Sequence, residues 1–325
     1  MNSFRTEINC LPGKPIGLDN KILTAGSCFA DQLGQWLASN KFTVSGNPFG
    51  TTYNPVSIHN LLLDALSETL DPNLFTERAG LWFHHAWHSQ FVASSKDELA
   101  TALQQTQKQV RAFLNELDIL ILTYGTAWVY ELKSSGRLVA NCHKVPGTQF
   151  NKRLLSVQEI VQSFSTLIQK LKALRPGLRI IFTVSPVRHI KDTFELNNVS
   201  KSVLRLACHE LQQKDLAEYF PAYEIMMDDL RDYRFYERDM IHPSAEARDY
   251  ISRKFSDRYF TADTLKLIHT LNEIQKALVH KPFQIASAAH QHFLKDTLRK
   301  LESVQHQLPV AAEIEQVRAQ LIHHA

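Results

Sequence analysis

The stretch KILTAGSCFAD (residues 21–31) joins a short apolar run to a Gly-Ser step and the start of a helical pattern. The apolar run predicts a strand, and apolar residues at helical spacing predict a helix over residues 28–39. A serine at a helix start is commonly an N-cap. With Gly26 before it, the same turn also allows Ser27 to expose its hydroxyl and aim its N–H at a developing oxyanion. The sequence leaves both roles open.

Strands and helices alternate along the chain after this turn. Apolar runs predict buried strands near residues 22, 119, 180 and 224. Helical spacing is found over residues 28–39, 56–68, 96–116, 156–174 and 199–219. This alternation predicts a mainly parallel sheet covered by helices. The ligand site of such a sheet lies beyond the carboxyl ends of its strands, where Ser27, Gly125, Thr126, Ser185 and His242 are all expected.

The segments between these elements have their own patterns. Gly, Asn and Pro dominate residues 44–55, which predicts a loop. Residues 87–91 alternate with period 2, as in a strand, and residues 127–142 predict a hairpin.

From residue 262 onward the chain has helical patterns without strands, over residues 262–278, 284–306 and 310–323. We therefore expect an α/β domain over residues 1–260. A helical extension over residues 261–325 would serve packing, oligomerisation or partner binding.

Composition narrows the class of protein. The 325 residues are 44% hydrophobic and 21% charged, which is ordinary for a globular protein with a sizeable core. The net charge of +3 disfavours a dedicated nucleic-acid binder. No apolar run approaches the roughly 18–20 residues of a membrane span. The N-terminus carries Glu7 and no apolar core of a signal peptide, and the four cysteines are widely spaced, so we expect a cytoplasmic location.

The segment DMIHP (residues 239–243) places a carboxylate three residues before an imidazole. Asp239 could accept the Nδ1–H of His242, which leaves Nε2 to take a proton from a serine. The alternative is a helix start, with residues 242–244 capping a helix that follows. Together with Ser27, the pair supplies the three groups that nucleophilic acyl transfer needs.

These segments resemble the GSCFA family, whose name stands here at residues 26–30. That family belongs with the SGNH, or GDSL-like, esterases and acyltransferases. Further blocks that look like the family, in the same order, are NPFGTTYNP (47–55), GTAWVY (125–130), NCHKVP (141–146), TVSPVR (183–188) and DMIHP (239–243). The resemblance covers about residues 20–260. It implies a three-layer α/β/α sandwich, flavodoxin-like in outline, with Ser27 as nucleophile, Asp239 and His242 as its partners, and no metal or organic cofactor.

The chain departs from the broader SGNH pattern at the oxyanion site. The usual Gly-Asp-Ser reads Ala-Gly-Ser, and the usual Gly-x-Asn reads Gly125-Thr126-Ala127. One oxyanion donor is worth roughly 3–4 kcal/mol in acyl transfer, so a substitute matters. The candidates are the Gly50 N–H, the Asn54 or Asn47 side chain and the Thr126 hydroxyl. We favour Asn54 or Gly50, because their polar loop can lean over the sheet edge.

Several other side chains invite a functional interpretation. His84, His85 and His88 form a cluster, but no cysteine or carboxylate joins them at a usual metal-ligand spacing. His84 and His143 either line the pocket or pack structurally. Arg188 follows a strand end, where it contacts an anionic substrate or remains a solvated charge.

The sequence therefore predicts a serine esterase or acyl hydrolase that acts on a small acyl ester or an acylated sugar. One alternative is an O-acyltransferase acting on a sugar or polyol with the same triad. The other is a non-catalytic binding module, which the altered Gly-x-Asn block favours. We expect no nucleic-acid or membrane partner, and the C-terminal helices offer a route to a homo-oligomer.

Overall fold

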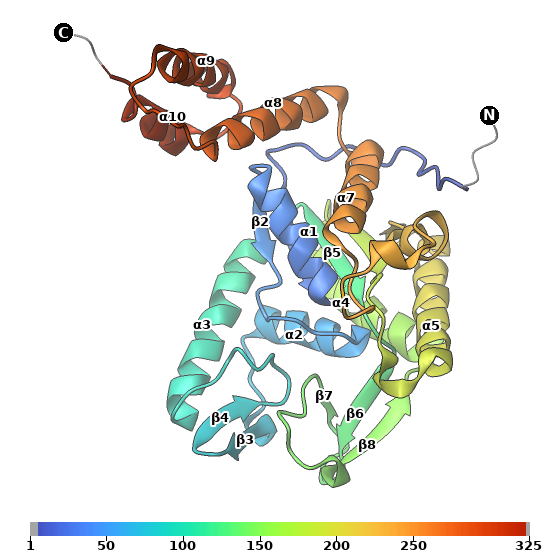
Figure 1. The fold of residues 1–325 in the computed structure, drawn as a ribbon. Helices are drawn as coiled ribbons and strands as arrows, with labels where there is room; N and C mark the ends of the chain where they lie inside the picture. Colours follow the sequence, from blue (N-terminus) through green and yellow to red (C-terminus); the bar gives the residue numbers. More distant parts are fainter. Residues whose placement is uncertain (1–5, 323–325) are drawn as a thin grey trace.

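The computed structural model describes residues 6–322 and is built around a five-stranded sheet with strand order β10-β9-β5-β1-β2. All four pairings in this sheet are parallel. Its strands are β1 (Lys21–Gly26), β2 (Thr43–Gly46), β5 (Ile119–Tyr124), β9 (Arg179–Val184) and β10 (Glu218–Tyr219). Renumbered within the sheet, this order is 2-1-3-4-5, the flavodoxin-like arrangement. The predicted fold is confirmed (Figure 1).

The central strands alternate between two hydrophobic cores, because successive side chains of a strand point to opposite faces. Leu23 and Leu120 belong to one core, while Ile22 and Ile119 belong to the other. The first core is covered by α2 (Pro55–Ser67), α3 (Lys96–Leu114), α4 (Val157–Leu174) and α5 (Phe194–Gln213). The second is covered by α1 (Cys28–Ser39) and α7 (Ala245–Tyr259). The molecule therefore has three layers, with the sheet between the helices.

Two small antiparallel sheets complete the α/β part and lie at the lower end in Figure 1. One pairs β3 (Phe75–Arg78) with β4 (Leu81–His84). The other contains β6 (Trp128–Leu132), β7 (Leu138–Val139) and β8 (Phe150–Leu154), and it confirms the predicted hairpin. Short helical segments connect the larger elements: η1 (Pro72–Leu74), η2 (Gly147–Gln149), η3 (Ile190–Asp192), α6 (Ala222–Glu224), η4 (Ile225–Asp229) and η5 (Tyr233–Phe235).

Four local predictions were wrong. The strand expected at 223–227 is α6 followed by the π-helix η4, and the last sheet strand is the shorter β10. Ile225 and Met226 are both buried in the second core, whereas adjacent residues of a sheet strand would face the two opposite cores. Residues 87–91 form turns, and residues 43–46, partly assigned to a loop, form the edge strand β2. Helix α5 also begins five residues earlier than expected, at Phe194.

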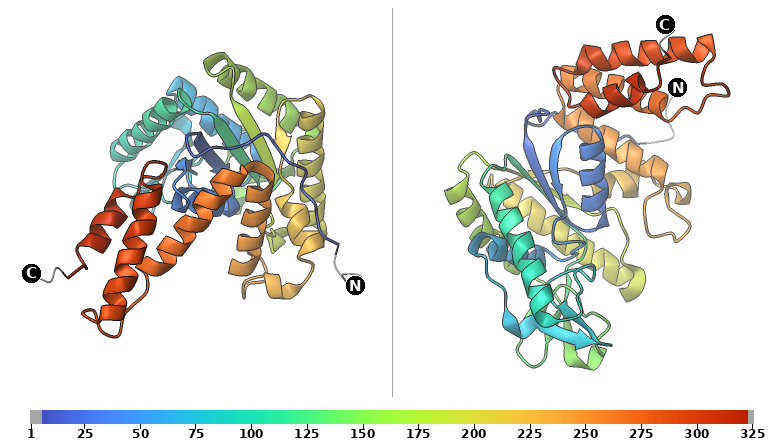
Figure 2. Two further views of the ribbon diagram at one scale, coloured as in Figure 1. Left: turned by 90° about the horizontal axis from the view of Figure 1, so that it is seen from above. Right: turned by 90° about the vertical axis from the view of Figure 1, so that its left-hand side faces the viewer.

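The C-terminal helices α8 (Ala262–Leu278), α9 (Ala288–Val304) and α10 (Ala311–Arg318) pack on one another (Figure 2). Their buried core includes Leu271 and Leu301. The expected third helix extends to residue 323, which lies outside the described residues, and the observed one ends at Arg318. Among residues 6–322, no helix has the length and apolar character that crossing a membrane requires.

Candidate active site

The turn between β1 and α1 places Ser27 where the central strands end. Gly26 has a φ of 140°, which suits glycine alone, and a Cβ at this position would clash with the Thr123 carbonyl oxygen of β5. Ser27 caps α1, because its Oγ accepts from the Phe29 N–H at 3.3 Å. The Ser27 N–H donates to Thr123 O at 3.1 Å, and the residue is 1% exposed. Ser27 therefore acts as the N-cap of α1. It lies at the carboxyl ends of β1 and β5, the neighbouring strands from which the chain continues toward opposite edges of the sheet.

Asn47 holds this turn from the side. Its Oδ1 accepts from the Gly26 N–H at 3.0 Å, and its Nδ2 donates to Gly26 O at 3.1 Å. Asn47 is buried, with a positive φ of 45° that asparagine tolerates better than most residues. The side chain considered as an oxyanion donor thus fixes the backbone just before Ser27.

Asp239 and His242 form a hydrogen-bonded pair. Asp239 Oδ2 lies 2.6 Å from His242 Nδ1, and Asp239 Oδ1 accepts from the N–H groups of Ile241 and His242 at 2.9 and 3.0 Å. These bonds, the His242 side chain first, lower the pKa of Asp239 to about 2. Both side chains are partly exposed. The pair therefore presents an oriented imidazole, with Nε2 as its remaining ring nitrogen.

A pocket of about 400 Å³ brings His242 together with the start of α1. Its wall includes Cys28, the first residue of that helix, and Tyr53, whose hydroxyl lies 3.9 Å from the Cys28 Sγ. Burial raises the pKa of Tyr53, so its hydroxyl is protonated at neutral pH. Within residues 6–322, Ser27 Oγ forms no hydrogen bond with His242.

The Gly50 and Asn54 groups are engaged within the protein. The Gly50 N–H donates to Asn47 O at 2.8 Å. Asn54 caps α2, because its Oδ1 accepts from the Ser57 N–H and its Nδ2 donates to Ser57 Oγ. Their loop follows β2 and packs beside the β1–α1 turn, since the Thr52 N–H donates to Gly26 O at 2.8 Å. In this conformation the two groups support the turn.

Gly125 and Thr126 follow β5 and also make internal bonds. Both N–H groups donate to Tyr53 O, at 2.8 and 3.1 Å. The Thr126 hydroxyl lies 3.0 Å from the Ser200 hydroxyl on α5. These contacts fix the end of β5 against the loop that carries Tyr53.

The histidines near the small sheets lie outside the pocket of His242. His84 Nε2 lies 3.0 Å from Asp71 O, and His143 Nε2 lies 3.0 Å from His84 O. Burial lowers the pKa of both histidines to about 4, so they are neutral at pH 7. The neighbouring His85 bonds Asn141 O through Nδ1. The described part of the chain contains no group of three or more side chains placed to hold a metal ion.

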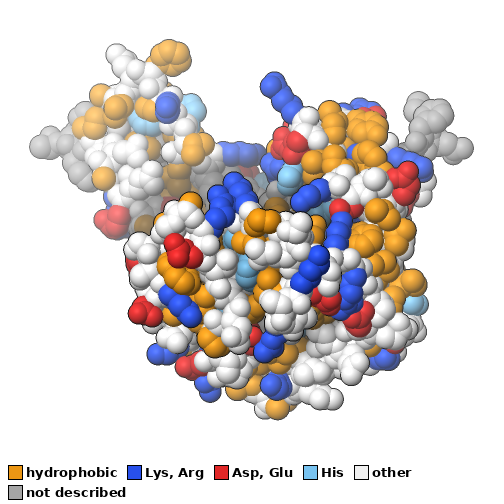
Figure 3. All heavy atoms as spheres, turned by 90° about the horizontal axis from the view of Figure 1, so that it is seen from below, with side chains coloured by type: hydrophobic (Ala, Val, Ile, Leu, Met, Phe, Trp, Pro, Cys, Tyr) orange, Lys and Arg blue, Asp and Glu red, His pale blue; other side chains and the backbone are white. Residues whose placement is uncertain are grey.

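Arg188 lies against the loop that carries the Asp239–His242 pair. Its backbone N–H donates to Ile241 O at 3.2 Å, and its Nη1 donates to Met240 O at 3.3 Å. Its guanidinium carbon lies 3.9 Å from the centre of the Tyr236 ring. Figure 3 shows lysine and arginine side chains around the middle of the lower face, with histidine atoms between them.

Sequence reasoning missed His189, which lines the pocket beside His242. Its buried Nε2 has no hydrogen-bond partner among residues 6–322, and burial lowers its pKa to about 3. Its ring meets Tyr53 edge-on at 5.1 Å. The only available signal was its place shortly after a strand end.

Lys201 was missed as well. It is fully buried on α5, and its Nζ donates to Gly125 O at 2.8 Å and Ser185 O at 2.7 Å. It thereby joins the ends of β5 and β9. Its spacing of three residues before Leu204 and seven before Cys208 puts it on the apolar stripe of the helix, which could have revealed it.

Several solved structures align with this chain at low similarity. A provisionally named acylhydrolase from Bacteroides fragilis NCTC 9343 aligns with TM-score 0.40 and 9% identity, over 79% of this chain and 91% of its own. A Streptococcus pneumonia protein named as a platelet activating factor gives 0.38 and 15%, over 75% and 84%. A carbohydrate esterase family 3 protein from Talaromyces cellulolyticus gives 0.34 and 9%, over 78% and 99%.

The sequence comparisons identify the family. No curated protein matches the chain. The family model described as the GSCFA family matches residues 21–255, and the model described as the C-terminal domain of GSCFA domain proteins matches residues 258–323. The first match alone spans most of the chain and contains Ser27, Asp239 and His242. The chain therefore belongs to the GSCFA family.

Proposed function

We propose that this protein is a serine-dependent ester hydrolase in which Ser27, His242 and Asp239 form the triad. The observation that carries the proposal is the 2.6 Å bond between Asp239 and His242, because His242 lines a pocket together with Cys28, the neighbour of Ser27. A carboxylate bound to Nδ1 fixes the tautomer of the imidazole and stabilises its protonated form. Nε2 is then the nitrogen that accepts a proton from the nucleophile.

The reaction begins when the Ser27 hydroxyl attacks the ester carbonyl carbon. His242 takes the hydroxyl proton and later returns it to the leaving alkoxide. Water then releases the acyl group from Ser27 by the same route. The serine–imidazole contact must form as the substrate binds, since such bonds are often long or misaligned in the free enzyme. Because Ser27 is only 1% exposed, the pocket wall beside Cys28 must open before a substrate can reach the Ser27 hydroxyl.

We place the oxyanion at the N-terminus of α1. The first four N–H groups of a helix have no partner within the helix. Those of Phe29 and Ala30 bond Ser27 Oγ and Ser27 O, at 3.3 and 2.7 Å. We therefore assign the Cys28 N–H as the main hydrogen-bond donor to the oxyanion. The positive end of the helix dipole adds to this stabilisation.

The test compares Ser27→Ala with Ser256→Ala, a matched change at another buried serine, which lies on α7. Turnover of p-nitrophenyl acetate should fall in Ser27→Ala, by a factor on the order of 10⁶ if the triad acts as a unit. It should persist in Ser256→Ala. Equal turnover in the parent and Ser27→Ala proteins would remove Ser27 from the mechanism.

A labelling experiment tests the same assignment without relying on a chosen substrate. A fluorophosphonate should modify Ser27 in the parent protein, and mass spectrometry should locate the adduct there. His242→Ala should label much more slowly, because the base that activates Ser27 is gone. A folded parent protein that is not labelled would favour a non-catalytic binding module.

A further inference from the structure

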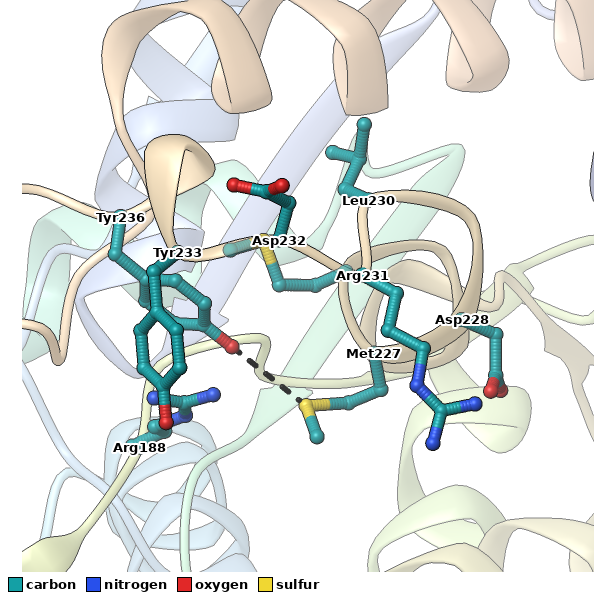
Figure 4. Close-up of a pocket in the computed structure, with 9 residues that line it drawn as sticks. Arg188, Met227, Asp228, Leu230, Arg231, Asp232, Tyr233 and Tyr236 are labelled. Atoms are coloured by element: carbon teal, nitrogen blue, oxygen red, sulfur yellow. Dashed lines mark hydrogen bonds between the residues drawn. The ribbon is translucent and has the colours of Figure 1, made fainter. Parts of the chain in front are cut away.

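A second pocket lies next to the candidate active site and is not used by the proposed triad. It has a volume of about 290 Å³, close to the lower limit for small-molecule sites. Figure 4 shows Arg188, Tyr233 and Tyr236 on one side of it and Arg231 and Asp228 on the other. We call it the tyrosine pocket, and a group about the size of one sugar ring would fill it.

Arg188 connects the two pockets. It lines both the tyrosine pocket and the pocket that contains His242. Its bonds to Met240 O and Ile241 O hold it against the loop of the Asp239–His242 pair. A ligand in the tyrosine pocket would therefore lie beside any ester held at His242, with the Arg188 guanidinium between the two parts.

An unusual backbone element forms part of the wall. The π-helix η4 supplies Met226, Met227 and Asp228. Such segments are rare and are found frequently at functional sites. This is also the segment where the sequence pattern predicted a strand, and disagreement between local pattern and final structure is expected to concentrate at functional sites.

The chemistry of the wall favours a neutral polyol. Two arginines, Arg188 and Arg231, face two carboxylates, Asp228 and Asp232, so an anion and a cation would each meet a like charge. Arg234 lies 3.1 Å from Asp232 and lowers its pKa, so this carboxylate is ionised at neutral pH. A long acyl chain would desolvate these charges without replacing their hydrogen bonds.

The aromatic residues supply what a sugar ring needs besides hydrogen bonds. Tyr233 is 65% exposed, while Tyr236 is buried and donates to Met227 Sδ at 3.7 Å. Tyrosine offers an apolar ring face together with a polar tip. Hydroxyl groups can bond to carboxylates and guanidinium groups, whereas the apolar face of a pyranose packs on a ring.

From these observations we infer that the tyrosine pocket binds the sugar ring of an O-acylated carbohydrate, while the ester carbonyl lies at Ser27. The position of the ester in this inference depends on the proposed function, in which Ser27 is the nucleophile. The occupancy of the pocket by a sugar can be measured without any turnover.

The binding test uses the Ser27→Ala protein with three probes: methyl glucoside, methyl galactoside and methyl xyloside. Saturation-transfer NMR should detect at least one of them, and adding Tyr233→Ala should abolish or strongly weaken the signal. Adding Phe283→Ala, which removes a fully exposed aromatic ring from the α8–α9 connection, should leave it unchanged. Absence of a signal for all three sugars, or equal loss in both variants, would overturn the inference.

The turnover test uses the active protein with p-nitrophenyl acetate and glucose pentaacetate. Tyr233→Ala should lower kcat/KM for the sugar ester about tenfold more than for the phenyl ester, the size expected for one aromatic contact. Equal losses for the two substrates would contradict a sugar subsite. Turnover of neither substrate by the parent protein would contradict the proposed function, while sugar binding by Ser27→Ala would still stand.

Discussion

The conformation of Gly26 determines where Ser27 lies. We expect Gly26→Ala to destabilise the protein by about 2–4 kcal/mol, because the backbone there has a positive φ and an added Cβ would meet the Thr123 carbonyl. Urea unfolding measures this loss. Gly177→Ala is the control, since a Cβ at residue 177 has open space. If both variants unfold at the same urea concentration as the parent, the turn does not have the geometry described here.

In the proposed mechanism, Asp239 acts through the imidazole of His242. Asp239→Asn should reduce kcat for p-nitrophenyl acetate by a factor on the order of 10⁴, because an amide holds the wrong tautomer of the ring. The melting temperature should change little, since the side chain is 45% exposed. Since its pKa is about 2, Asp239 stays ionised above about pH 4 and does not limit activity there. A variant that retains full kcat would show that this carboxylate does not orient the base.

At the scale of elements, Lys201 on α5 joins the ends of β5 and β9. Burial lowers its pKa to about 7, whereas an unfolded lysine titrates near 10.4. Between these values the unfolded chain binds one more proton than the folded protein. This group therefore makes the folded state more stable as pH rises from about 7 to 10.

Lys201→Met removes that pH dependence and leaves two carbonyls without their donor, so it should be less stable than the parent at pH 9. Its deficit should grow by roughly 1 kcal/mol per pH unit above pH 7. Urea unfolding of both proteins at pH 7, 8 and 9 gives the difference directly, because other titrating groups cancel. A deficit that is constant across this range would mean that Lys201 stays charged when buried.

The elements that could be predicted from sequence are those in which local and tertiary signals agree. Strand β5 is a continuous apolar run and was predicted near residue 119, while α4 has a complete capping box and was predicted within one residue of its observed bounds. The segment 223–227 is a short apolar run, which periodicity cannot assign to strand or helix. Its π-helix depends on contacts of Ile225 and Met226 with the second core, which only the fold creates.

In the candidate site too, some features could be predicted from sequence and others could not. Ser27, Asp239 and His242 could be named because their spacing from strand ends and from each other carries chemistry. The partners of Gly50, Asn54 and similar polar groups could not be named, since each depends on a loop meeting a distant strand. Sequence therefore names the proposed reacting groups more readily than the groups that position them.

At the scale of the whole molecule, the two family matches meet near residue 257 and the packing changes at the same place. Helices α8 to α10 have their own core, and Ile268 of α8 also joins the second core of the α/β part. An ion pair between Lys41 and Glu313, at 2.5 Å, and a bond from Gln275 to Ser39 O cross between the parts. The contacts that join the C-terminal helices to the α/β part are therefore fewer than the contacts within either core.

Leu301 is fully buried in the helical core and absent from the other two large cores. We expect Leu301→Ala to destabilise the C-terminal helices by about 2–5 kcal/mol while the main sheet keeps its stability. Hydrogen exchange should become faster in α8 to α10 and stay slow in β1 and β5. Turnover should persist, since Ser27 and His242 lie on the other part. Leu61→Ala is the counterpart in the first core and should accelerate exchange in the sheet. If Leu301→Ala accelerates exchange equally in both parts, the two cores unfold as one unit, and the C-terminal helices are integral to the fold that positions the site.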